Sequence, residues 1–313
     1  MKRTWFVFVI ALAFTAPAFA QNPNQIAILR WYPANLTTTF PVGNGPQDLA
    51  FDGSSIWVAN TYGDSLTKLR ASDGALLGTF PLGAGTSPTG IAYDGANIWV
   101  TTSPNKIKKV RGSDGTVLGT FTVGTGDNSL AFDGANIWVT NETANNVSKV
   151  RASDGAVLGT FAAGTGPAAI AFDGANLWVT SAGDNTVLKL RASDGIILGT
   201  FPVGTNPLGV AFDGTNIWVA NSASSNVTKL RASDGAVLGT FSVGIGPLGV
   251  AFDGTNIWVV NVGSDTVTKL KAISGAVLGT FAVGSVPVGV AFDGASMWVA
   301  NFNSSHSGTV SKL

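Results

Sequence analysis

Few side chains in this sequence could carry chemistry, because its 313 residues include one His and no Cys. The imidazole is His306, in a Ser-rich stretch that begins after Phe302. If the ends of the chain meet, His306 approaches Asp48, Tyr62 or Asp64, and a His–Asp pair can act as a general base. The other interpretation is a solvated loop histidine. The sequence favours it, since no nucleophile or metal constellation accompanies His306.

Composition argues against several classes of site. One His, no Cys and no dense carboxylate run predict neither a metal site nor a bound cofactor. The formal net charge is +0, so the chain lacks the broad basic surface that nucleic acid requires, and we expect no nucleic-acid partner.

Two charged residue types recur in register along the chain. An Asp precedes Gly in each of seven copies, and we interpret it as a turn-forming residue rather than a cation ligand. A Lys recurs as well, and we expect its stem to lie along a Trp indole with the ammonium in solvent, in preference to a phosphate-binding ring. The two sets are Asp52, Asp94, Asp133, Asp173, Asp213, Asp253 and Asp293, and Lys68, Lys109, Lys149, Lys189, Lys229, Lys269 and Lys312.

A repeat of about forty residues positions these side chains. Its marker is a Trp in the frame F/Y-D-G-x-x-φ-W-V, at Trp57, Trp99, Trp138, Trp178, Trp218, Trp258 and Trp298. In residues 248–281 the segments LGVAFDG, TNIWVVN, TVTKLKA and AVLGTF read as four short strands, A to D. Seven such units predict an all-β, seven-bladed β-propeller with four antiparallel strands per blade.

The ends of the chain predict how the ring closes. A D-type strand at Leu36–Phe40 would join A-to-C strands that end at Thr309–Leu313, so residues 36–313 form the propeller. Ser-Asp-Gly between strands C and D predicts a two-residue hairpin with positive φ at both central positions. We expect both faces of every strand to be buried between blades.

The first residues look like a targeting segment. Lys2 and Arg3 precede an apolar run and Ala18-Phe19-Ala20, which predicts a signal peptide over 1–20 and a lead segment over 21–35. We therefore expect an exported protein, periplasmic, secreted or at the cell surface, without a membrane span in its mature form.

The segment WVANSASSNVTKLRASDGAVLGTFSVG (218–244) resembles the units of the YVTN-repeat β-propellers. The resemblance covers about residues 36–313 and implies an exported or cell-surface protein with a binding role. More distantly the blades are similar to those of streptogramin lyases and lactonase-type propellers. The lyase resemblance implies a histidine base assisted by a divalent cation, for which His306 is the available residue.

The copies differ mainly in the D-to-A and B-to-C links, which alternating strand direction brings to one face. Blades one to three begin strand A with polar residues and blades four to seven with apolar ones, so we expect a channel mouth that is polar on one side and apolar on the other. Drift of unconstrained loops is the alternative explanation. The candidate ligand-binding residues are Gln47, Asp48, Tyr62, Asp127, Asn128, Glu142, Leu208, Leu248 and His306.

These observations favour a monomeric binding or interaction module that holds a small molecule, peptide or partner protein at this mouth. The alternative is a lyase or lactonase-type enzyme with His306 as base. A third interpretation is a structural surface protein, which would assemble into larger particles.

Overall fold

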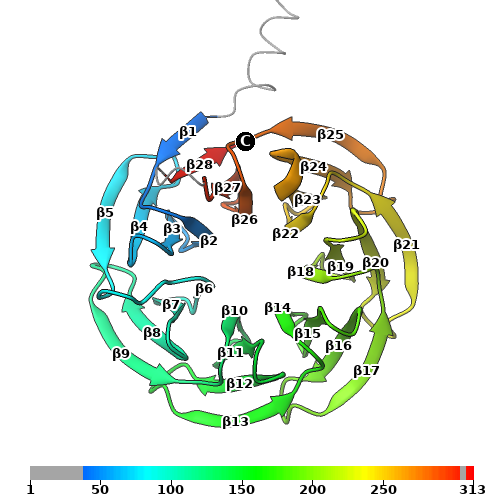
Figure 1. Ribbon diagram of the computed structural model, residues 1–313, viewed down its shortest axis with the longest axis horizontal. Helices are drawn as coiled ribbons and strands as arrows, with labels where there is room; N and C mark the ends of the chain where they lie inside the picture. Colours follow the sequence, from blue (N-terminus) through cyan, green and yellow to red (C-terminus); the bar gives the residue numbers. More distant parts are fainter. Residues whose placement is uncertain (1–37, 304–307) are drawn as a thin grey trace, which may run out of the picture. The chain divides into compact units, whose positions relative to one another are not determined.

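The computed structural model describes residues 38–303 and 308–313. These residues form seven four-stranded antiparallel sheets arranged as blades around a central channel (Figure 1). The predicted seven-bladed propeller is therefore confirmed. The predicted signal peptide and lead segment, residues 1–20 and 21–35, lie outside the described residues.

Each blade runs from an inner strand A at the channel to an outer strand D at the rim (Figure 1). In that order, the blades comprise β2 (Pro46–Phe51), β3 (Ser55–Asn60), β4 (Ser65–Arg70) and β5 (Leu76–Pro81); β6 (Ile91–Tyr93), β7 (Asn97–Thr102), β8 (Lys106–Arg111) and β9 (Val117–Thr122); β10 (Asp127–Phe132), β11 (Asn136–Asn141), β12 (Asn146–Arg151) and β13 (Val157–Ala162); β14 (Pro167–Phe172), β15 (Asn176–Ser181), β16 (Thr186–Arg191) and β17 (Ile197–Pro202); β18 (Pro207–Phe212), β19 (Asn216–Asn221), β20 (Asn226–Arg231) and β21 (Val237–Ser242); β22 (Pro247–Phe252), β23 (Asn256–Asn261), β24 (Thr266–Lys271) and β25 (Val277–Ala282); and β26 (Pro287–Phe292), β27 (Met297–Asn301), β28 (Thr309–Lys312) and β1 (Thr38–Pro41). A single 3-10 turn, η1 (Val262–Ser264), lies in the described B-to-C links.

The ring closes as predicted, through a blade built from both ends of the chain. Strand β1 pairs antiparallel with β28, with Phe40 opposite Val310. The Phe40 ring packs on Trp298 with centroids 5.5 Å apart, the same contact that Phe80 makes with Trp57 inside blade one. Closure therefore reproduces an ordinary blade interior and leaves no gap in the ring.

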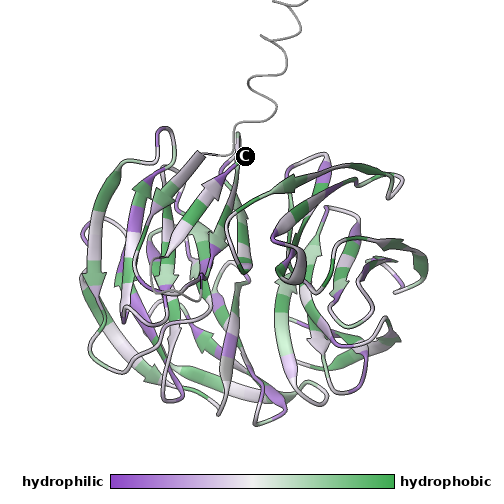
Figure 2. Ribbon diagram, turned by 45° about the horizontal axis from the view of Figure 1, so that its top comes forward, coloured by the Kyte–Doolittle hydropathy of each residue, from purple (hydrophilic) through white to green (hydrophobic). Residues whose placement is uncertain are grey.

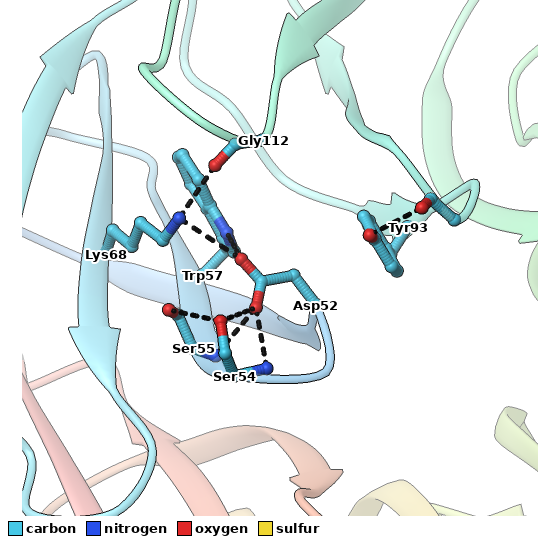
Figure 3. A network of polar contacts seen from close by, with 8 residues as sticks. Asp52, Ser54, Ser55, Trp57, Lys68, Tyr93 and Gly112 are labelled. Atoms are coloured by element: carbon cyan, nitrogen blue, oxygen red, sulfur yellow. Dashed lines mark hydrogen bonds and ion pairs between the residues drawn. The ribbon is translucent and has the colours of Figure 1, made fainter.

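The repeated Asp forms the A-to-B turn and also orients the buried Trp. In blade one, Oδ1 of Asp52 accepts the backbone N–H groups of Ser54 and Ser55, while Oδ2 accepts the indole N–H of Trp57 at 2.8 Å (Figure 3). The turn-forming role is as predicted. The bond to the indole adds a second role, because a buried indole N–H needs an acceptor.

The expectation that the repeated Lys ammonium reaches solvent is wrong for six of the seven repeated lysines. Nζ of Lys68 lies 4.8 Å from the centroid of the Trp57 ring and donates a 2.7 Å hydrogen bond to the carbonyl of Gly112 in the next blade (Figure 3). The tight interface between blades leaves an unpaired turn carbonyl within reach, so the ammonium joins two blades. Equivalent bonds run from Lys109 to Ala152, Lys149 to Ala192, Lys189 to Ala232, Lys229 to Ala272 and Lys312 to Ala71.

The predicted two-residue C-to-D hairpin is also wrong. The turn spans four residues, since Arg70 N–H bonds to the carbonyl of Ala75 and Gly74 N–H bonds to that of Arg70. Gly74 has φ of 75° and Asp73 does not share this conformation. Instead, Asp73 accepts the N–H of Ala75 and pairs with Arg70, which stabilises the longer turn.

Burial on both faces holds for strand B but fails for strand D. Every residue of β3 is buried, whereas β5 alternates between exposed and half-buried positions. Hydrophobic residues consequently extend along the outer strands as well as inside the blades (Figure 2). Leu76 and Leu77 are 62% and 44% exposed, because no further strand or blade packs outside the rim.

Candidate functional site

The D-to-A and B-to-C links gather on one face, as the sequence predicts, and we call it the loop face. In blade one the N–H of Thr61, in the B-to-C link, bonds to the carbonyl of Gly45 in the preceding D-to-A link at 2.8 Å. Tyr62 N–H bonds to the carbonyl of Asn44 in the same way. These bonds require both kinds of link to lie side by side.

Side chains at the ends of the B-to-C links brace this face. Asp64 accepts the N–H groups of Gly85 and Ser87 from the following D-to-A link, at 2.7 and 2.8 Å. These bonds lower the pKa of Asp64, because they favour the carboxylate. Asn145 and Asn185 hold the next links through bonds of 2.8 Å. Hydrogen bonds therefore hold these links in place on the loop face.

A pocket of about 180 Å³ opens between the first halves of the inner strands, at the loop-face end of the channel. We call it the channel pocket. Its wall is polar where blades one to three contribute, through β2, the residues just before β6, and β10, and apolar where β18, β22 and β26 of blades five to seven contribute. The predicted separation of polar and apolar sides is therefore present, although none of the described lining residues comes from blade four. The lining residues are Gln47, Asp48, Thr89, Gly90, Asn128, Ser129, Leu208, Gly209, Val210, Leu248, Gly249, Val250, Val288, Gly289 and Val290.

Neighbouring inner strands approach each other closely around this pocket. A Cβ on Gly209 would lie 1.8 Å from the carbonyl oxygen of Leu248, and one on Gly289 would lie 2.6 Å from that of Gln47. Glycine at this position therefore allows the backbones of neighbouring inner strands to approach this closely. Aligned with the other blades, this position holds Gly90, Ser129, Ala169, Gly209, Gly249 and Gly289, but in blade one it holds Asp48.

Asp48 thus places a carboxylate where the other six blades have a small residue. Its Oδ1 accepts the N–H of Leu49 at 2.9 Å, and its Oδ2 accepts that of Ile91, on the neighbouring strand β6, at 3.3 Å. Strand β6 has three residues where β2 has six, so the N–H of Ile91 lies at the start of its strand. Burial raises the pKa of Asp48 to about 7, although both hydrogen bonds act to lower it.

The other predicted site residues lie at several distances from this pocket. Gln47, Asn128, Leu208 and Leu248 line it together with Asp48. Glu142 is exposed in the B-to-C link beside it, where Oε2 lies 3.4 Å from Nδ2 of Asn128.

Tyr62 is 61% exposed on the loop face. Its ring packs edge-on against Phe302 of blade seven, with centroids 5.1 Å apart, and it does not line the channel pocket. Asp127 begins β10, where its backbone pairs with that of Asn141. His306 lies outside the described residues, so its predicted approach to Asp48, Tyr62 or Asp64 stays a prediction.

Sequence reasoning did not include the second half of the pocket wall. Val210 and Val250 lie two positions after the predicted Leu208 and Leu248, and with Val290 they line the same pocket. These valines could have been predicted, because side chains on one face of a strand recur at every second residue. The Gly positions between them also carried a signal, because a small residue at one place in six aligned units marks a close approach of backbones.

Residues 38–303 and 308–313 contain no group of three His, Cys, Asp or Glu side chains that could hold a metal ion. Over the same two ranges no helix is long and apolar enough to cross a bilayer.

Solved structures share this architecture. A streptogramin B lyase structure superimposes with a TM-score of 0.75 and 18% identity, over 88% of this chain and 97% of the other. Virginiamycin B lyase from Staphylococcus aureus gives 0.74 and 18%, over 89% and 100%, and Kuenenia stuttgartiensis hydrazine synthase gives 0.72 and 18%, over 86% and 95%. At this identity the likeness establishes the fold alone. No family model matches the chain, and no curated protein is similar to it in sequence.

Proposed function

We propose that this chain is an exported binding module whose ligand enters the channel pocket from the loop face. The ligand is a small molecule, or a protruding end of a peptide or partner protein, with both polar and apolar parts. Ligand pockets commonly combine apolar walls with a few directed polar groups. Placement in the YVTN-repeat family, which the units resemble, is part of the same proposal.

The segregated wall of the channel pocket carries this proposal. Gln47 and Asn128 supply amide donors and acceptors from one arc of the ring, and Leu208 supplies apolar surface from β18, across the channel (Figure 1). Packing of the inner strands alone does not require polar and apolar side chains to lie in different blades. Rigid strands hold both arcs, so the site is organised before a ligand arrives.

The second candidate is a lyase or lactonase-type enzyme that uses His306 as general base. Its support is the fold shared with two lyases, which is a likeness of architecture. A turnover screen with lactones and cyclic depsipeptides tests it. Activity that Leu208→Asn leaves intact and His306→Ala abolishes would favour the enzyme over the binding module. A structural surface protein, the third interpretation, would instead form large particles visible by light scattering.

Binding of cyclohexanol, followed by ligand-observed NMR, tests the binding module. Leu208→Asn makes the apolar arc polar, and the fold should tolerate it because Asn128 stands at the same position in blade three. We expect the variant to weaken binding by roughly tenfold, as the loss of one apolar contact implies. Leu198→Asn, on the exposed rim strand β17, is the matched control and should leave binding unchanged. Equal binding by all three proteins would refute the site.

A further inference from the structure

The channel pocket holds a carboxylate, Asp48, that has no cationic partner among residues 38–303 and 308–313. None of the ion pairs between described side chains includes Asp48. Among the lining side chains that the structure describes, Asp48 is the one with a formal charge. The ionised carboxylate of Asp48 therefore lies beside an apolar wall without a cation. This arrangement costs free energy unless a bound cation offsets the charge.

The positions of the basic residues explain why Asp48 has no ion-pair partner among the described side chains. In the described ranges every Lys and Arg lies on the third strand of a blade, two strands away from the channel. Lys108, on the third strand of blade two, bonds to the carbonyl of Leu82. Lys149 and its equivalents bond to carbonyls of the next blade. The Lys and Arg side chains of the described ranges thus belong to strands away from the pocket.

The neighbours of β2 offer no charge either. The elements packed against it are β3, β26, β27 and β6. Of these, β3, β26 and β27 contain no titratable residue, and β6 contains Tyr93, whose hydroxyl bonds to the carbonyl of Gly95 in the A-to-B turn at the opposite end of the strand. Glu142, whose carboxylate accepts a hydrogen bond from the amide of Asn128, is also acidic.

Acidic residues also lie on the loop face, at the end where the pocket opens. Asp64, Glu142, Asp184 and Asp265 lie in the B-to-C links of the loop face. Hydrogen bonds from backbone N–H groups lower the pKa values of Asp64 and Asp184, so both are ionised near neutral pH. These carboxylates favour the approach of a cation to the loop face.

We propose that the channel pocket selects small amphipathic ligands that carry a protonated amine, with Asp48 as the counter-ion and Leu208 and Leu248 as the apolar contacts. This inference rests on the proposed function and adds the ligand's charge class. An ammonium suits the site better than a metal ion, because one carboxylate cannot supply the several oxygen ligands that Ca²⁺ or Mg²⁺ takes. Gln47 and Asn128 supply amide oxygens for the remaining N–H donors.

The test compares cyclohexylamine, cyclohexanol and cyclohexanecarboxylate, which share a ring and differ in head group. Asp48→Ser is the variant, because Ser129 occupies this position in blade three and the fold accepts it. At pH 8 we expect the amine to bind the wild-type chain about tenfold more tightly than the alcohol, as a charge-assisted hydrogen bond implies. Asp48→Ser should remove this preference, so that the amine and the alcohol bind the variant with similar affinity. At pH 5.5 the preference should shrink in the wild type, since Asp48 is then largely protonated.

The outcomes separate this inference from the proposed function. If the alcohol and the amine bind equally and Asp48→Ser changes neither, the charge class is wrong while the binding pocket stands. If none of the three probes binds, both proposals fail. Tighter binding of the carboxylate, or binding of Ca²⁺ that excludes the amine, would overturn the assignment of an organic cation.

Discussion

The indole Nε1 of Trp138 donates a 2.8 Å hydrogen bond to Oδ2 of Asp133, five residues earlier. The same bond, of 2.7 to 2.8 Å, recurs in all seven blades. It joins the A-to-B turn to the largest buried side chain of the blade. The pKa of Asp133 is lowered because the bonds from Trp138 and the turn outweigh the opposing effect of burial.

Replacing Asp133 with Ala should therefore destabilise the protein by about 1–3 kcal/mol, the cost of leaving a buried donor unpaired. Asp154→Ala is the matched control, since Asp154 lies in an exposed turn and pairs with Arg151 at the surface. A surface pair contributes at most about 1 kcal/mol. Urea denaturation measures both. Equal losses would mean that the indole bond adds nothing to the turn.

The bond between blades made by Lys149 predicts a second loss of stability. Its Nζ lies 5.0 Å from the Trp138 ring centroid and donates to the carbonyls of Ala192 and Ser193 at 2.7 and 3.2 Å. Lys149→Met keeps the stem and removes the charge, so we expect a loss of about 1–3 kcal/mol by urea denaturation. Lys106→Met, at an exposed position of β8, should change stability by less than about 0.5 kcal/mol. A neutral result for Lys149→Met would restore the expectation of a solvated ammonium.

Ring closure can be separated from ordinary packing by comparing Phe40→Ala with Phe80→Ala. Both rings pack on a Trp in nearly the same geometry, but Phe40 alone lies on the closing strand. Each substitution should cost about 3 kcal/mol through the lost ring. Only Phe40→Ala should also promote association in light scattering, because loosening β1 exposes the edge of β28. If Phe80→Ala associates to the same extent, closure is not the cause.

The pKa of Asp48 predicts how stability varies with pH. Its folded value of about 7 lies above the ordinary 3.8, so between these values the folded state binds more protons than the unfolded state. Stability therefore falls as pH rises through this range, by up to about 4 kcal/mol, and the penalty is complete above pH 7. Asp48→Ser removes it, so the variant should gain stability over the wild type at pH 8 and not at pH 4, as thermal unfolding across pH would measure.

Asp64→Ser should change the dependence of stability on pH in the opposite direction. The pKa of Asp64 is lowered, so its contribution is present above the unfolded pKa and is lost as pH falls through the folded one. This variant should be less stable than the wild type at pH 8, and the difference should fade toward acid pH. Parallel pH profiles for the two variants would contradict both assignments.

Much of the channel pocket was predictable because the repeats form an internal alignment. Gln47, Asn128, Leu208 and Leu248 differ at one aligned position, and a ring brings aligned positions together. Tyr62 lies on the loop face outside the lining of the channel pocket, and its contact with Phe302 could not be predicted because it depends on packing between blades one and seven. The Lys ammonium was misplaced for a similar reason: the carbonyl that it binds belongs to the next blade, and a single unit does not contain it.

The sequence by itself determined the number of blades, the strands of each blade, the closing strand and the face on which the copies differ, because all of these follow from a local pattern repeated seven times. Only the tertiary structure decided which side chains face the channel pocket, how closely the inner strands approach and what surrounds Asp48. These depend on distances between neighbouring blades. A carboxylate acquires a raised pKa from the surfaces that exclude water around it, and those surfaces come from residues far away in the chain.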